Sequence, residues 1–242
     1  MTTAIMLTEK PKATQSHAAG FRTFAPLGET RAGVKQLMPQ SIEWSEMMVE
    51  KRLEKIPYLV DLIKTGKARL MFYDRATSTC QEKAEIAGID IKSVFKALVV
   101  EHFDPSSFES VLHMVVTDGT KKVDICGLFS SLEGFSEMGT AHIRQNIKPS
   151  KTPPTGMPFG TIGPLIGKHN EHEIGRIIMK RPNGESDMEV DLSIGDVSLK
   201  EIGEREEISH RFSVRIRYCD LVEVLGRIYP DKVHIVEGIP AN

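Results

Sequence analysis

The sequence has little of what builds secreted, zinc-binding or membrane-spanning proteins. Its 242 residues contain three cysteines, Cys80, Cys126 and Cys219, with no C-x-x-C pair. Such a set argues against both a disulfide framework and a cysteine zinc site. The N-terminus has no apolar core of signal-peptide length, and prolines break the longest uncharged stretch, 152–167. We therefore expect a cytoplasmic protein without a membrane-spanning segment.

The charge balance is close to neutral, so no global field points to a partner. The formal net charge is −2, and the composition is 40% hydrophobic and 26% charged, which is ordinary for a soluble globular protein. This gives no general electrostatic case for nucleic-acid binding and leaves room for a local basic patch. Arg215 and Arg217 alternate onto one face of a predicted strand, where solvated surface or phosphate contact would explain them.

The chain divides into an extension and one larger domain. Residues 1–39 are polar and are broken by prolines and glycines without sustained periodicity. We assign 1–39 as an N-terminal extension and 40–242 as the domain.

Local patterns predict both strands and helices. Thr79 and Glu82 form an S/T-x-x-E capping box before a helix that Gly88 ends, and Asp118-Gly119 is a hairpin-turn signal. The expected class is α/β of the α+β type, with a mixed, largely antiparallel sheet and helices packed around it. Helices are predicted from residue 42 and at 58–64, 80–87, 136–147 and 220–228, and strands at 68–73, 94–100, 111–116, 122–125, 174–179, 188–192, 198–202 and 212–218.

Lys96 is the most informative residue, because it lies inside the apolar run Val94–Val100. Strand periodicity places Lys96 on one face with Val94, Leu98 and Val100, and neither face of the run looks hydrated. A buried cation is tolerated when it is paired, when it reaches an edge, or when its pKa falls, as in reactive lysines. The alternative is a strand-end lysine whose head reaches water, beside Glu101.

A loop rich in proline and glycine, 153–167, is the second unusual feature. Its glycines allow the backbone to approach a ligand and present N–H groups, while its prolines stiffen the path. The loop lacks the lysine of a Walker A motif and the spacing of a dinucleotide fingerprint. A rigid connection between strands is the alternative interpretation.

Three stretches in this order, Thr79–Ile89, Val94–Val100 and Gly160–Pro164, resemble the YbaK/ProX aminoacyl-tRNA deacylase family, which includes the prolyl-tRNA synthetase insertion domain. The resemblance covers roughly residues 68–228. The segment Tyr218–Leu221 is also similar to the family's junction between a strand and a helix. The resemblance implies a barrel-like sheet surrounded by helices.

The resemblance also implies an activity, trans-editing, which is hydrolysis of the ester that joins a wrong amino acid to the terminal ribose of a tRNA. In the family, the lysine corresponding to Lys96 is the residue most associated with activity. Some members carry an acidic residue where this chain has Ser213. The implied substrate-binding residues are Gly160, Thr161, Ile162, Gly163, Pro164 and Ser213.

The expected partners are the acceptor end of an aminoacyl-tRNA and an aminoacyl-tRNA synthetase, with no metal or cofactor. The alternative is a non-catalytic module of the same fold that binds tRNA, a synthetase or an amino-acid-like ligand. His169 and His172 form an H-x-x-H pair without a third ligand in view, and Cys80 begins a helix without an adjacent histidine to activate it. The edited amino acid stays open, with alanine, cysteine and serine all compatible.

Overall fold

The structure is a computed structural model that describes residues 34–36, 57–73, 77–120, 122–150, 163–165, 174–182, 187–193 and 212–241. The helix predicted from residue 42, the strand predicted at 198–202 and most of the predicted extension lie outside these residues. Val34–Gln36, within the predicted extension, forms β1 at an edge of the sheet. Among the described helices, none is both long and apolar enough to cross a bilayer.

The nine described strands form one mixed sheet in the order β1-β2-β8-β7-β3-β4-β6-β9, with β5 also paired to β3. Antiparallel pairings join β1–β2, β2–β8, β8–β7, β3–β4 and β3–β5, and parallel pairings join β3–β7, β4–β6 and β6–β9. The predicted α+β class with a mixed, largely antiparallel sheet is confirmed. The strands are β1 (Val34–Gln36), β2 (Ala68–Tyr73), β3 (Val94–Asp104), β4 (Glu109–Asp118), β5 (Ile147–Pro149), β6 (Ile174–Lys180), β7 (Glu189–Leu192), β8 (Phe212–Arg217) and β9 (Val233–Val236).

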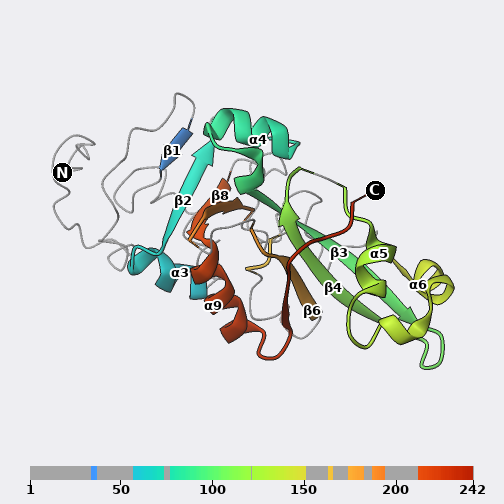
Figure 1. Cartoon of the computed structure of the whole chain (residues 1–242). Coiled ribbons are helices and arrows are strands. Elements are labelled where there is room, and N and C mark those ends of the chain that lie inside the picture. The colour runs from blue at the N-terminus through green and yellow to red at the C-terminus, as the bar shows by residue number, and fades with distance from the viewer. Residues whose placement is uncertain are drawn as a thin grey trace, which may run out of the picture.

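Helices cover both faces of this sheet (Figure 1). One face packs against α3 and α9 through a large apolar cluster that includes Phe95, Val99 and Leu225. The other face packs against α5 and α6 through a second cluster that includes Val100 and Phe129. The described helices are α3 (Pro57–Lys64), α4 (Cys80–Ala87), α5 (Ile125–Ser130), α6 (Thr140–Asn146) and α9 (Tyr218–Ile228), with 3-10 turns at Ile91–Ser93 and Ser136–Met138.

Helix α4 forms as its capping signals predict. The Thr79 side chain accepts a hydrogen bond from the backbone N–H of Glu82, and the Glu82 carboxylate accepts one from the N–H of Thr79. The helix ends at Gly88, whose φ of 65° lies in the left-handed region that glycine favours. The helix bounds Cys80–Ala87 and the strand bounds Ala68–Tyr73 are those that the sequence predicts.

The hairpin predicted around Asp118-Gly119 is wrong. Strand β4 instead pairs with the preceding strand β3 across the turn at 105–108, and the residues predicted as a strand at 122–125 lead into α5. Asp118 accepts a hydrogen bond from the Thr120 backbone N–H at 3.0 Å, which turns the chain locally. Gly119 serves close packing, because a Cβ there would lie 2.5 Å from the Cβ of Cys80.

The single helix predicted at 136–147 is also wrong. A 3-10 turn at Ser136–Met138 and helix α6 are separated by Gly139, whose φ of 75° lies outside the helical region. Ile147 then begins strand β5. Strand β9 was not predicted, and β3 runs to Asp104 rather than ending at Val100.

Histidines lie inside the second apolar cluster, beneath α5 and α6. The His113 side chain is 4% exposed and contacts the rings of Phe129 and Phe135, with the His102 ring 6.1 Å away. Neither ring nitrogen of His113 has a hydrogen-bond partner among the described residues. Burial, followed by the positive charge that His102 and Arg176 carry when protonated, lowers the pKa of His113 to about 4.

We predict that His113→Phe reduces the acid sensitivity of the fold. Between pH 7 and pH 4, an unfolded chain protonates His113 while the folded protein resists doing so, and the wild-type free energy of unfolding therefore loses about 3 kcal/mol at this position. Phenylalanine cannot bind that proton. Urea denaturation of both proteins across this pH range measures the difference, and parallel pH profiles would contradict the assignment.

Candidate functional site

Lys96 lies on β3 beside the point where β7 separates from it. The parallel pairing with β7 joins Val94 to Asp191 and Phe95 to Leu192, and the pairing with β5 begins at Val100. Among the described residues, no strand pairs with β3 on this edge between these two pairings. Lys96 is half-buried there, and its face continues toward the apolar cluster under α5 and α6, as the alternation along the run predicts.

A cleft of about 250 Å³ opens beside Lys96. This volume is slightly below the range typical of drug-sized ligand sites, and it suits a small group such as one amino acid. Within the described residues, the cleft is bounded by the N-terminal end of α4, the start of β3 and the end of β7. Its described lining residues are Thr77, Ser78, Thr79, Cys80, Lys83, Val94, Phe95, Lys96, Ala97 and Ser193.

The N-terminal end of α4 at the cleft is capped by the chain itself. The Glu82 carboxylate accepts hydrogen bonds from the Ser78 hydroxyl at 2.7 Å, from the Ser78 N–H at 2.8 Å and from the Thr79 N–H at 3.2 Å. These bonds, the Ser78 hydroxyl first, hold the pKa of Glu82 below its ordinary value. Two lysine side chains, Lys83 and Lys96, also line the cleft and bring positive charge to it.

A buried carboxylate lies next to the cleft. Asp191 is 1% exposed, and its Oδ1 lies 2.8 Å from the Nζ of Lys83. Its Oδ2 accepts hydrogen bonds from the Tyr73 hydroxyl at 2.8 Å, from Arg215 Nε at 3.1 Å and from the Ser213 hydroxyl at 3.1 Å. We call these five residues the Asp191 network. It joins α4 to three adjacent strands, β2, β8 and β7.

Charge pairing keeps Asp191 ionised in this dry environment. Burial alone would raise the pKa of the carboxyl, but the charges of Lys83 and Arg215 outweigh that effect, and the pKa lies below its ordinary value. Burial, and then the negative charge of Asp191, raises the pKa of the Tyr73 hydroxyl, which stays protonated and donates. The network is thus held by two cations and one carboxylate.

The Asp191 network and the cleft share one face of the sheet. On β7, Asp191 and Ser193 are two residues apart, and so are Val94 and Lys96 on β3. Asp191 is in register with Val94 on one side and with Arg215 on the other. The Asp191 network and Lys96 therefore lie on the same face of the sheet, with the apolar Val94 beside Asp191 on β3.

A second depression, of about 260 Å³, lies between α3 and α9. Its basic residues are already engaged. Lys67 pairs with Asp220 at 3.2 Å and with Glu223 at 3.2 Å, and Arg227 pairs with Glu223. The depression also lies on the opposite side of the sheet from Lys96, over the large apolar cluster. The Lys96 cleft is therefore the stronger candidate for a functional site.

The predicted site residues differ in where the structure places them. Lys96 lines the cleft. Ser213 is fully buried within the Asp191 network. Gly160, Thr161 and Ile162 lie outside the described residues, so their convergence with Lys96 stays a prediction.

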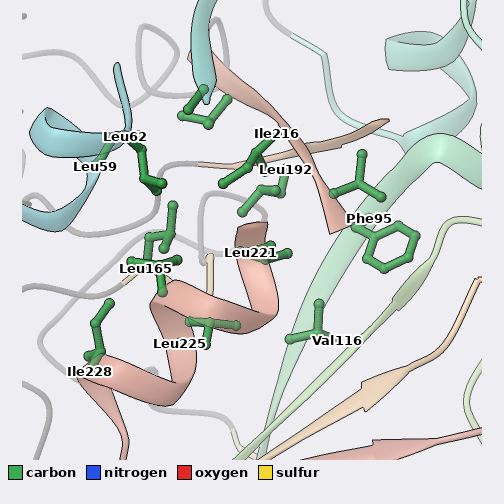
Figure 2. Close-up of a cluster of buried hydrophobic side chains, with 14 of the residues drawn as sticks. Leu59, Leu62, Phe95, Val116, Leu165, Leu192, Ile216, Leu221, Leu225 and Ile228 are labelled. Carbon is green, nitrogen blue, oxygen red and sulfur yellow. The ribbon is translucent and has the colours of Figure 1, made fainter. Parts of the chain in front are cut away.

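The end of the predicted loop packs into the large apolar cluster. Gly163 and Pro164 are buried, and Leu165 is 0% exposed. Figure 2 shows Leu165 close to Leu225 of α9. This cluster covers the face of β3 opposite Lys96, and none of the three residues is among the described lining of the cleft. A contact of Gly163 or Pro164 with substrate therefore also stays a prediction.

Other candidates from the sequence have different outcomes. His169 and His172 lie outside the described residues. Within the described part of the chain, no group of three or more potential metal ligands gathers. Cys80 lines the cleft without a histidine among the described lining residues. Arg215 pairs with buried Asp191 instead of facing solvent.

Sequence reasoning missed Lys83 and Asp191. Asp191 stands between Val190 and Leu192 on a buried strand, which is the same kind of signal that singled out Lys96. Lys83 carries no such signal, because α4 is short and a lysine on a helix is normally exposed. Only the fold brings these two residues together.

Comparisons with known proteins give distant structural likenesses. No family model and no curated protein matches the chain. A scaffold protein from work on computational epitope grafting is 13% identical, with a TM-score of 0.49, and the match covers 79% of this chain and 98% of that one. A hypothetical protein is 18% identical, with a TM-score of 0.48 and coverage of 74% and 97%.

A third solved structure is described as that of a proposed trans-editing enzyme for prolyl tRNA synthetase. It is 13% identical to this chain, with a TM-score of 0.46, and the match covers 77% of this chain and 98% of that one. Likenesses at this level transfer no activity. The function has to be inferred from the chain's own residues.

We predict that Asp191→Ala lowers the free energy of unfolding by about 3–5 kcal/mol, because it leaves Lys83 and Arg215 without their buried carboxylate. The matched control is Glu189→Ala on the same strand. The ion pair of Glu189 with Arg69 is substantially exposed, so its loss should change stability by about 1 kcal/mol or less. Urea denaturation measures both variants, and equal losses would show that the buried network does not stabilise the fold.

Proposed function

We propose that this protein is a trans-editing aminoacyl-tRNA deacylase, a hydrolase that cleaves the ester of mischarged tRNA at the Lys96 cleft. One observation carries the proposal. A lysine within a long strand of buried and half-buried residues lines a small cleft, and the same lysine occupies the motif position in the resemblance to the YbaK/ProX family. The half-burial of Lys96 also fits a residue retained for chemistry.

The chemistry of ester cleavage suits such a site. An aminoacyl ester is already activated, so the protein has to position a water molecule and stabilise the negative charge that develops on the carbonyl oxygen. A lysine ammonium fixed on a strand supplies a positive charge for that oxygen or orients the terminal adenosine. No protein nucleophile is needed, and Cys80 has no role in this scheme.

The size of the cleft is consistent with the substrate. A volume of about 250 Å³ accommodates one amino acid, and the tRNA remains outside. We assign the acceptor end of an aminoacyl-tRNA as the ligand. An aminoacyl-tRNA synthetase is the proposed protein partner, in line with the resemblance.

The loop Gly160–Pro164 is assigned the second half of the site. In this proposal, its backbone N–H groups complete the environment of the carbonyl oxygen and Pro164 shapes the pocket for the amino acid. The burial of Leu165 in the apolar core supports a fixed end for the loop. A fixed end helps to keep backbone donors aimed at a ligand.

The serine at position 213 favours the alternative, a binding module without turnover, because some family members carry a carboxylate there. The Asp191 network weakens this objection. The Asp191 carboxylate lies 3.1 Å from the Ser213 hydroxyl, and the neighbouring strand thus supplies an acidic group to the same region.

We predict that Lys96→Ala lowers the rate of ester hydrolysis by about a hundredfold or more for a mischarged tRNA that the wild-type protein cleaves. The substitution removes the cation that stabilises the negative charge on the carbonyl oxygen in the transition state. Lys96→Arg should also fail, since a forked guanidinium does not replace a compact ammonium. Lys92→Ala, which removes a nearby exposed lysine, is the matched control. The measurement follows ester loss over a panel of mischarged tRNAs.

Two outcomes would contradict this assignment. Unchanged deacylation by Lys96→Ala would remove Lys96 from the mechanism. Binding of charged tRNA with no turnover of any ester by the wild-type protein would select the binding module instead.

A further inference from the structure

Lys83 is the second lysine that lines the cleft, and the proposed mechanism of ester cleavage does not use it. It lies on α4 between exposed Gln81 and Glu85 but is itself 7% exposed. Burying an ion pair stabilises a fold no better than a well-packed apolar pair. Stability alone therefore does not explain why a lysine and Asp191 occupy these positions.

The Lys83 ammonium has hydrogen-bond donors to spare. An ammonium carries three N–H groups. In the described part of the chain, its polar partner is Asp191 at 2.8 Å, and its other contact is the Tyr73 ring, whose centroid is 5.9 Å away. Asp191 fixes the position of the ammonium, and the remaining donors are available to a ligand oxygen in the cleft that Lys83 lines.

The relative burial of the two lysines orders them along the cleft. Lys96 is half-buried and Lys83 is buried. A substrate whose ester carbonyl lies at Lys96 therefore directs its inner portion toward Lys83. That portion is the amino-acid side chain, because the positively charged α-amino group is repelled by an ammonium.

An apolar side chain at this depth would cover the Lys83 ammonium without satisfying it. Burying a charged donor without a hydrogen-bond partner is unfavourable. An oxygen acceptor on the ligand avoids this cost, because it takes the place of the water molecule that the ligand displaces. A site built to hydrogen-bond a substrate group discriminates strongly against an analogue that lacks the group. Seryl and alanyl esters differ by one such oxygen.

Building on the proposed deacylase function, we infer that Lys83 is a specificity-determining residue that selects aminoacyl groups whose side chain carries a hydrogen-bond-accepting oxygen. Asp191 is its positioning residue, since it holds the ammonium at the cleft. Serine is the smallest such substrate, and alanine is the matched substrate to be rejected.

The test compares seryl and alanyl esters on the same tRNA. The wild-type protein should have a kcat/KM at least about tenfold higher for the seryl ester, as expected for a hydrogen bond to a charged group. Lys83→Met keeps an unbranched side chain of similar length and should bring the ratio close to one. If the substitution only weakened the folded enzyme in general, kcat/KM would fall for both esters and their ratio would stay as in the wild type.

A second variant and a binding measurement keep the inference separate from the proposed function. Lys83→Leu, which also lacks a donor and leaves Asp191 paired with Arg215, serves if Lys83→Met does not fold. Calorimetric titration with the stable seryl and alanyl amides of 3′-amino-3′-deoxyadenosine reads selectivity without hydrolysis. The wild type should bind the seryl amide more tightly, and the variants should not distinguish the two.

The results separate the two ideas. If the wild-type protein cleaves both esters equally well, or if its preference for serine survives in the variants, the role of Lys83 is overturned and the deacylase function stands. If no ester is cleaved, the deacylase function is wrong, and the affinities for the seryl and alanyl amides then test the role of Lys83. A seryl preference that depends on Lys83 then supports the inference, and equal affinities or no binding overturn it.

Discussion

The cleft depends on one buried interaction, the pairing of the Asp191 carboxylate with Lys83 and Arg215. A carboxylate at 1% exposure is tolerated only when its charge is compensated. Lys83 comes from α4 and Arg215 and Ser213 from β8, and the hydrogen bond from Tyr73 adds β2. The ion pair therefore ties α4 to the strands, and the N-terminal end of α4 forms one wall of the cleft.

The sheet gives its two faces different roles. Along β3, Phe95 and Val99 enter the large apolar cluster under α3 and α9, while Lys96 lies on the opposite face. The apolar face supplies most of the buried hydrophobic surface. Polar and charged groups can then be placed on the other face, between α4 and the cluster under α5 and α6, where the pairing of β7 with β3 ends.

Sequence patterns predicted the elements whose signals are local. The capping box at Thr79 and Glu82 fixes the start of α4, and the alternation along β8 and the apolar positions of α9 give these elements to within a few residues. Asp118-Gly119 was misread as a hairpin turn because Gly119 serves a long-range contact with Cys80. A turn motif alone does not distinguish these two uses of glycine.

The site was predictable in part for the same reason. Lys96 is conspicuous because a charge inside an apolar run is visible in the sequence itself. The Lys83–Asp191 pair joins residues more than one hundred positions apart, and no local pattern links a helix lysine to a strand carboxylate. The position of Ser213 was recognised, but its burial beside Asp191 depends on strand order.

The central claim is that the Lys96 cleft is where the ligand binds. A crystal structure of the protein with a stable aminoacyl-adenosine amide tests this most directly. The account predicts the aminoacyl group within the cleft, with an oxygen at hydrogen-bonding distance from the Lys96 ammonium. An amide bound in the depression between α3 and α9, or anywhere else without contact to Lys96, would contradict it.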